Sequence, residues 1–137
     1  MEERGRAEMS ARAATVRKGK QRMSPEQAAG GREIAAAEAI AVIELVNYQR
    51  GAVVSRTIVK RAVGTVTLFA FDEGEGLSEH TAAFDALAHV LEGEAEIVIS
   101  GKAIRTKAGE AVLMPAHLPH ALKAITRFKM MLTLIRE

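Results

Sequence analysis

The chain of 137 residues contains no cysteine and no tryptophan, and its aromatic side chains are limited to four phenylalanines and one tyrosine. The lack of cysteine excludes a disulfide framework, a thiolate metal site and a cysteine nucleophile. With so few aromatic residues, a core must be built from Val, Ile, Leu, Ala and Met. Hydrophobic residues make up 48% of the chain, which is enough to fill the interior of one domain.

Long apolar runs and several catalytic motifs are also missing. No stretch approaches the ~18–20 apolar residues of a membrane-spanning helix, and the N-terminus lacks the apolar run of a secretory signal. The sequence therefore predicts a cytoplasmic protein with no membrane partner. It has no phosphate-binding loop, no dinucleotide fingerprint, and neither G-x-S-x-G nor H-E-x-x-H. These absences argue against nucleotide-binding, serine-hydrolase and zinc-protease mechanisms.

Basic residues are concentrated at the start of the chain. Residues 1–33 hold eight Arg or Lys and five Asp or Glu, so the remainder is close to neutral. The basic run at residues 17–22 could contact phosphates by non-specific electrostatics. No helix-turn-helix, finger spacing or aromatic-interleaved basic strand supports nucleic-acid recognition. We expect residues 1–33 to form a disordered basic extension and residues 34–137 to form one barrel domain.

Short strands are the expected structure of this domain. Residues 53–59 and 66–71 are dense in β-branched and aromatic side chains. In the second half of the chain, turn signals recur about every 8 to 12 residues, as in an all-β sandwich or barrel. Residues 94–100 alternate between a polar and an apolar face. Before the strands, the alanine-rich residues 34–41 suggest a short helix. The pattern predicts an all-β, small antiparallel barrel with a flexible or partly helical N-terminal extension.

Two patterns of glycine, histidine and proline occupy the centre of the sequence. The first, Gly-x5-His-x-Ala-x3-Ala-x6-Gly, begins at Gly74 and ends at Gly93. The second, Gly-x5-Pro-x-His-x2-His-x3-Ala, begins at Gly109 and ends at Ala124. Gly93 and Gly109 suit hairpin turns, where glycine adopts positive φ without strain. The proline of the second pattern suits a strand end, because it cannot donate a ladder hydrogen bond.

These patterns resemble the two motifs of the cupin superfamily, in particular of its small single-domain members. The cupin motifs are G-x5-H-x-H-x3,4-E-x6-G and G-x5-P-x-G-x2-H-x3-N. The chain keeps one histidine of each motif, at His80 and His120. Alanine replaces the second histidine and the glutamate, at Ala82 and Ala86, and His117 replaces a glycine. The resemblance implies a jelly-roll-like barrel over roughly residues 45–136, in which the two motifs face each other.

The resemblance also implies a metal site, since three histidines and one carboxylate usually hold iron, manganese, nickel or zinc in metal-binding cupins. It offers His80 and His120 as ligands in this chain. Asp85 lies one residue before the usual glutamate position, and a β-bulge could turn its carboxylate inward. His89 could join in the same shifted register. Two histidines and one carboxylate form a set suited to non-haem iron. We expect His117, at a bend, to face solvent.

The expected function is binding of a small molecule at His80 and His120, directly or through a metal ion, and enzyme activity is left open. For an enzyme, the range of the family implies dioxygenase, isomerase or related chemistry. A metal would then act as a Lewis acid or oxygen-activating centre, or a neutral histidine as a general base. Alanine at positions 82 and 86 favours an alternative, a metal-free binding or sensing module without catalysis. A third interpretation is an oligomer-forming accessory domain.

Small cupins commonly pair, so the resemblance implies a homodimer. Residues 42–48 are the segment that could add to the edge of a partner's sheet, because an unpaired strand edge is an association site.

Overall fold

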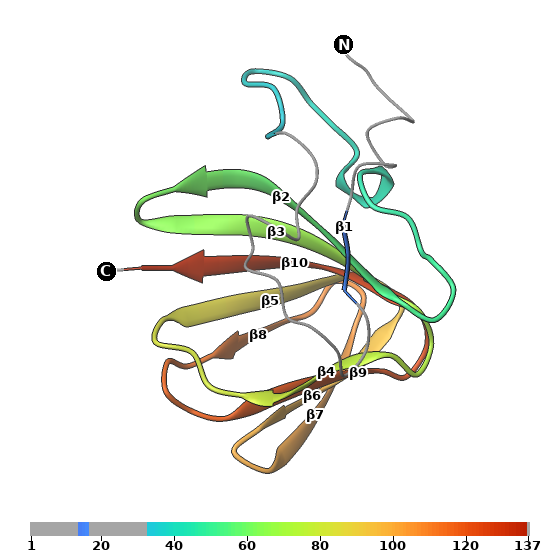
Figure 1. The fold of residues 1–137 in the computed structure, drawn as a ribbon, viewed down its shortest axis with the longest axis vertical. Helices are drawn as coiled ribbons and strands as arrows, with labels where there is room; N and C mark the ends of the chain where they lie inside the picture. The colour runs from blue at the N-terminus through green and yellow to red at the C-terminus, as the bar shows by residue number, and fades with distance from the viewer. Residues whose placement is uncertain (1–13, 17–32, 137) are drawn as a thin grey trace.

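The computed structural model describes residues 14–16 and 33–136, and most of their regular structure is β-strand. Two antiparallel sheets curve around a shared interior (Figure 1). One sheet has the order β1-β2-β3-β10-β5-β8, and the other has the order β4-β9-β6-β7. The strands are β1 (Ala14–Val16), β2 (Val53–Arg61), β3 (Gly64–Phe71), β4 (Gly76–His80), β5 (Asp85–Glu92), β6 (Glu94–Ile99), β7 (Lys102–Lys107), β8 (Ala111–Met114), β9 (His120–Ala124) and β10 (Phe128–Ile135). The all-β, antiparallel prediction is confirmed.

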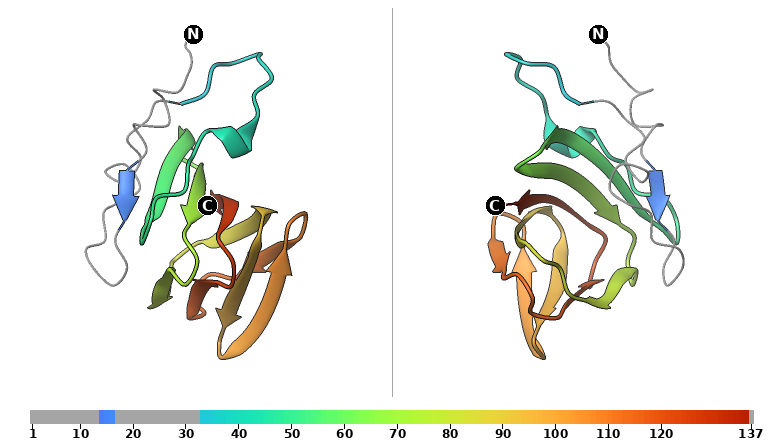
Figure 2. Two further views of the ribbon diagram at one scale, coloured as in Figure 1. Left: turned by 90° about the vertical axis from the view of Figure 1, so that its right-hand side faces the viewer. Right: turned by 60° about the vertical axis from the view of Figure 1, so that its left-hand side comes forward.

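The residues before β2 differ from the sequence-based expectation. Residues 34–41 contain a turn and no helix, so the short helix predicted there is wrong. Every alanine in this stretch is exposed, and a short helix without a buried face gains too little to form. The basic extension lies outside the described residues, apart from Glu33 and Ala14–Val16. The latter segment pairs with β2 as the outermost strand of its sheet (Figure 2).

The segment of residues 42–48 covers its own sheet. It contains a single turn of 3-10 helix, η1 (Val42–Glu44), after which Leu45 and Val46 are buried against the outer side of β2 and β3. The segment forms no strand within this chain, and its addition to the edge of a partner's sheet stays a prediction. No helix in residues 33–136 is long and apolar enough to cross a membrane.

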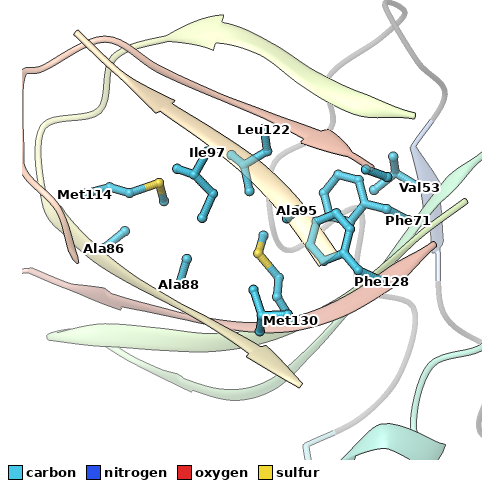
Figure 3. Close-up of a cluster of buried hydrophobic side chains, with 12 residues drawn as sticks. Val53, Phe71, Ala86, Ala88, Ala95, Ile97, Met114, Leu122, Phe128 and Met130 are labelled. Carbon is cyan, nitrogen blue, oxygen red and sulfur yellow. The ribbon is translucent and has the colours of Figure 1, made fainter. Parts of the chain in front are cut away.

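The main core lies between the two sheets. Strand register aligns Val53, Phe71 and Phe128 in one inward row, and the two phenylalanine rings stack with centroids 4.4 Å apart. Figure 3 shows this row at one end of the core and shows Met114 and Ala86 at the other. The core thus has an aromatic end and an end built from a methionine and small side chains.

Two glycines are required by close backbone contact. Gly93 turns the chain from β5 to β6 with φ of 79°, and a Cβ there would collide with the carbonyl oxygen of Arg127. Gly64 begins β3 directly after the turn that follows β2, and a Cβ there would collide with the carbonyl oxygen of Leu134. A side chain at either position would force neighbouring strands apart.

Candidate functional site

Two histidines from separate motifs meet where β4 ends and β9 begins. His80 and His120 are direct partners in the antiparallel register. The pairing shifts between Leu77 and His80, an irregularity of the kind that re-aims a side chain. The Nε2 atoms of the two rings are 3.1 Å apart, the ring centroids are 4.3 Å apart, and the ring planes make an angle of 70°.

Each ring is held through its other nitrogen by a backbone carbonyl. Nδ1 of His80 lies 2.8 Å from the carbonyl oxygen of Ser78, and Nδ1 of His120 lies 3.1 Å from that of Leu118. A carbonyl only accepts hydrogen bonds, so each Nδ1 carries a proton, and each ring in its neutral form presents a lone pair at Nε2. Two lone pairs this close favour a proton, a donor group or a metal ion between or beside them. Metal-ligating histidines are commonly oriented by the same carbonyl contact.

The two rings differ in their surroundings. His120 is 5% exposed, whereas His80 is exposed to solvent. Burial lowers the pKa of His120 below its usual value, and the neighbouring His80 lowers it further. The bond to the Leu118 carbonyl acts in the opposite direction and is the smallest of the three effects. At neutral pH the His120 ring is therefore uncharged, with its Nε2 lone pair available to a ligand.

The histidine pair lies at the end of the core that contains Met114 and Ala86. Along β6, Ala95 and Ile97 follow one another away from the aromatic end (Figure 3). Ile99 continues this row, packs against the same core and pairs with His120. The pair is therefore placed next to the end where inward side chains are small.

The structure does not bring Asp85 and His89 to the pair. Both lie on the outward side of β5, whose alternate residues face the core. The pairing of β5 with β8 and with β10 runs through this part of the strand without a shift, so it contains no bulge that could turn Asp85 inward. Oδ1 of Asp85 instead accepts a hydrogen bond of 2.8 Å from the backbone N–H of Ala116. This aspartate caps the turn after β8.

His117 faces solvent, as expected from its place at a bend. It stands where the cupin motif has glycine, and its φ of 70° keeps the left-handed backbone that glycine favours. Its backbone N–H donates to the carbonyl oxygen of Ala82 at 2.7 Å. This residue therefore joins the two motif segments through its backbone, while its ring is directed to solvent.

The donors at the site are suitable for a metal ion in kind but few in number. No group of three His, Cys, Asp or Glu side chains in residues 33–136 could hold a metal together. Ala86, at the motif position of the glutamate, is buried and ends in a methyl group. Two nitrogens that each lie ~2.1 Å from one ion, with an N–metal–N angle of about 90–110°, are about 3.0–3.4 Å apart. The 3.1 Å distance between Nε2 of His80 and Nε2 of His120 falls in this range. A four-ligand cupin centre does not fit this chain. A two-imidazole centre fits where the bound molecule supplies further donors.

Sequence reasoning overlooked three inward-facing threonines, Thr57, Thr65 and Thr67, on β2 and β3. They are buried on the same face of their sheet as Phe69 and Phe71. The signal was the period of two, since Thr65 and Thr67 alternate in step with these phenylalanines. These inward hydroxyl groups, next to that of Ser55, mark a polar place inside the barrel.

The fold and the histidine pair define a small antiparallel β-barrel protein with a polar centre at one end of its apolar core. The chain belongs to the cupin superfamily. The family model described as "Cupin domain" matches residues 67–135, which include both motifs.

Several solved structures resemble this protein. A conserved protein of unknown function from Streptococcus pyogenes is 32% identical with a TM-score of 0.72, over 77% of this chain and 92% of that one. A cupin superfamily protein from Desulfitobacterium hafniense is 26% identical with a TM-score of 0.72, over 77% and 96%. A cupin 2 conserved barrel domain protein from Leptotrichia buccalis is 39% identical with a TM-score of 0.67, over 69% and 46%. No curated protein matches the sequence. These comparisons establish the family and leave the reaction open.

Proposed function

We propose that this cupin binds a small molecule at His80 and His120, and that their Nε2 atoms are the protein's ligands to a divalent transition metal. The observation that carries this proposal is the 3.1 Å separation of the two Nε2 atoms, with both Nδ1 atoms occupied by carbonyls. The bound molecule completes the coordination, because two imidazoles are fewer than the three protein ligands of a typical site.

Iron, manganese, nickel and zinc all accept imidazole ligands. When bound, such an ion supplies Lewis acidity to an oxygen of the ligand. The chain itself orients the two rings, through the carbonyl groups of Ser78 and Leu118. It also limits water on the buried side, where Ile99 pairs with His120 and packs on the core.

Metal analysis of protein purified without a chelating tag tests the proposal. We expect close to one equivalent of a transition metal in the wild-type protein and its loss in the double variant His80→Ala, His120→Ala. His89→Ala and His117→Ala are matched controls, because each removes an imidazole outside the pair and should keep the metal. Equal metal content in the double variant and the wild type would show that the ion is bound elsewhere.

A metal-free binding module is the second candidate. It is favoured by Ala82 and Ala86, which stand where other cupins have a histidine and a glutamate. In this case the Nε2 lone pairs would accept hydrogen bonds from a hydroxyl group of the ligand. Chelator-treated protein would then keep its affinity for the ligand, whereas removal of either imidazole would reduce it.

We further propose that the protein is a homodimer, as membership of the cupin superfamily supports. Leu87 and Leu113 are neighbours in register on the outward side of β5 and β8, and they are 38% and 55% exposed. Among the described strands β8 lies at the edge of its sheet, so this leucine pair lies where a second copy could pack. Light scattering should give twice the chain mass, and Leu113→Lys should shift the protein toward monomer. A monomeric wild type contradicts this proposal.

A further inference from the structure

The three inward threonines of β2 and β3 border the same end of the interior as the histidines. Building on the function proposed above, we propose that Thr57, Thr65 and Thr67 bind an uncharged oxygen of the small molecule, either a hydroxyl or a carbonyl group. His80 and His120 hold the other end of the same ligand. The site is thus built for a compact molecule with an apolar body and an oxygen at each end.

Strand pairing places these threonines in consecutive rows. Thr57 and Thr67 are opposite each other, with their Oγ1 atoms 3.0 Å apart. Thr65 lies in the next row, where it pairs with Leu134, and Leu134 pairs in turn with Ala86. The three threonines are 7%, 6% and 6% exposed. The hydroxyl groups therefore lie inside the barrel.

The row that contains Thr65 is at the histidine end. Ala86 pairs with Met114, and Figure 3 shows both at the end of the core away from Phe71 and Phe128. His120 extends the core at this same end, from the other sheet. The threonines and the histidines thus border one part of the interior from two facing sheets.

Within residues 33–136, two of these three hydroxyl groups have no acceptor for their proton. In the bond between Thr57 and Thr67 one hydroxyl donates and the other accepts, so one O–H remains without an acceptor. The hydroxyl of Thr65 makes no hydrogen bond with any described residue. None of the three hydroxyl oxygens is both fully buried and without a partner, so their free protons remain available to an oxygen of a ligand.

The uncharged side chains around the threonines favour a neutral ligand group over a charged one. Adjacent inward positions carry apolar side chains, such as Ala88 and Leu132. A charged residue on this face, Lys60, is opposite Thr65 but exposed. Arg56, beside Thr57 in the chain, is buried but lies on the other face of β2, so a carboxylate placed against the threonines would have no buried counter-charge on its own face, which is costly. A hydroxyl or carbonyl oxygen exchanges hydrogen bonds with threonine and brings no charge into the interior.

Three phenols that differ only at the para position test this proposal: 4-hydroxybenzyl alcohol, 4-ethylphenol and 4-hydroxybenzoate. All present the same phenolic oxygen to the histidines, while the far end is a hydroxyl, an apolar group or a carboxylate. We expect the full-length protein to bind the alcohol about 3- to 10-fold more tightly than 4-ethylphenol, as one neutral hydrogen bond allows. The carboxylate should bind most weakly. Calorimetric titration measures all three affinities.

Variants then identify the group that discriminates between the probes. Thr57→Val and Thr67→Val keep the branched shape and should abolish the preference for the alcohol, whereas Thr67→Ser keeps a hydroxyl and should retain it. Thr106→Val is the matched control. Thr106 is 1% exposed, but its hydroxyl donates to the carbonyl oxygen of Ile104 in the other sheet.

Several outcomes overturn the inference: an unchanged preference in the valine variants, tighter binding of the carboxylate, or binding of none of the probes by the wild type. Failure of the proposed function looks different. If His80→Ala leaves the affinity for all three probes unchanged, the histidine pair is not the binding centre. If His80→Ala weakens binding of all three probes, but the valine variants keep the preference for the alcohol, only the proposed threonine site is wrong.

Discussion

The Nε2 atoms of His80 and His120 face each other at 3.1 Å because β4 and β9 pair at these two residues. The same local bond holds each ring, from Nδ1 to the carbonyl oxygen two residues earlier, at Ser78 and Leu118. Because Nδ1 of each ring is bound to a carbonyl, Nε2 of both rings is left free at the point where the two rings meet. Protons, metal ions and hydrogen-bond donors therefore compete for the same two nitrogens.

Stability should fall when the pH is lowered in the presence of a chelator. Burial and the neighbouring His80 lower the pKa of His120 in the folded state, whereas its pKa in the unfolded chain is about 6.5. In acid the unfolded state then binds more protons than the folded state. The stability that the neutral His120 contributes is therefore complete above about pH 6.5 and is lost as the pH falls through the pKa of His120 in the folded state. Urea denaturation at several pH values measures this dependence.

His120→Gln is the control for this titration, because other groups also titrate in acid. The variant should lose less stability than the wild type between about pH 7.5 and 5.5. A wild-type protein that is equally stable across this interval, or less sensitive to acid than the variant, contradicts the expectation.

Added Ni²⁺ or Zn²⁺ should raise the Tm of the chelator-treated protein, after the chelator has been removed. An ion that binds only the folded state at 100 times its Kd stabilises by about 2.7 kcal/mol. His80→Ala should abolish the shift and His89→Ala should preserve it. Acidification should weaken the shift in the wild type, because protons displace the ion from Nε2. A shift that persists in His80→Ala would place the ion elsewhere.

Tyr48→Phe should destabilise the protein by about 1–2 kcal/mol. The hydroxyl of Tyr48 donates to Oε2 of Glu92 at 2.6 Å and so ties the segment before β2 to the sheet. Burial, followed by this hydrogen bond, raises the pKa of Tyr48, so the group stays a protonated donor. Phenylalanine keeps the ring that the Arg127 guanidinium covers at 4.2 Å. Urea midpoints within error of the wild type would show that the bond contributes nothing.

Gly93→Ala should be far more destabilising than Gly101→Ala. Both glycines have positive φ, 79° and 83°, so each alanine pays about 1–2 kcal/mol for left-handed backbone. At Gly101 a Cβ meets nothing within 4 Å, whereas at Gly93 it collides with the Arg127 carbonyl oxygen. We expect a total loss of about 3 kcal/mol or more at Gly93. Equal losses in denaturation midpoints would mean that the backbone of Arg127 moves aside freely.

Much of the strand pattern could be predicted from local sequence. Residues 66–71, which are dense in β-branched and aromatic side chains, lie within β3. Ala95 and Ile97 face the core, as the alternation of β6 predicts. Gly93 adopts the positive φ expected of a hairpin glycine. These features depend on residues that are close in sequence, so they can be read without the fold.

The site was less accessible to sequence reasoning. A bulge at Asp85 was plausible from its position beside the motif, but continuous pairing on both sides of β5 keeps its carboxylate outward. Thr57 and Thr67 look like ordinary strand residues until pairing places their hydroxyl groups 3.0 Å apart. Residues 34–41 have helical composition, yet nothing packs against their alanines.

By itself, the sequence determined the succession of strands and turns and the presence of His80 and His120 in two cupin-like motifs, because alternation and turn chemistry are local properties of the backbone. Only the tertiary structure decided that these two rings meet while Asp85 and His89 face outward. The physical reason is register: a strand shifted by one residue would exchange its inward and outward side chains, and only pairing with distant strands sets that shift.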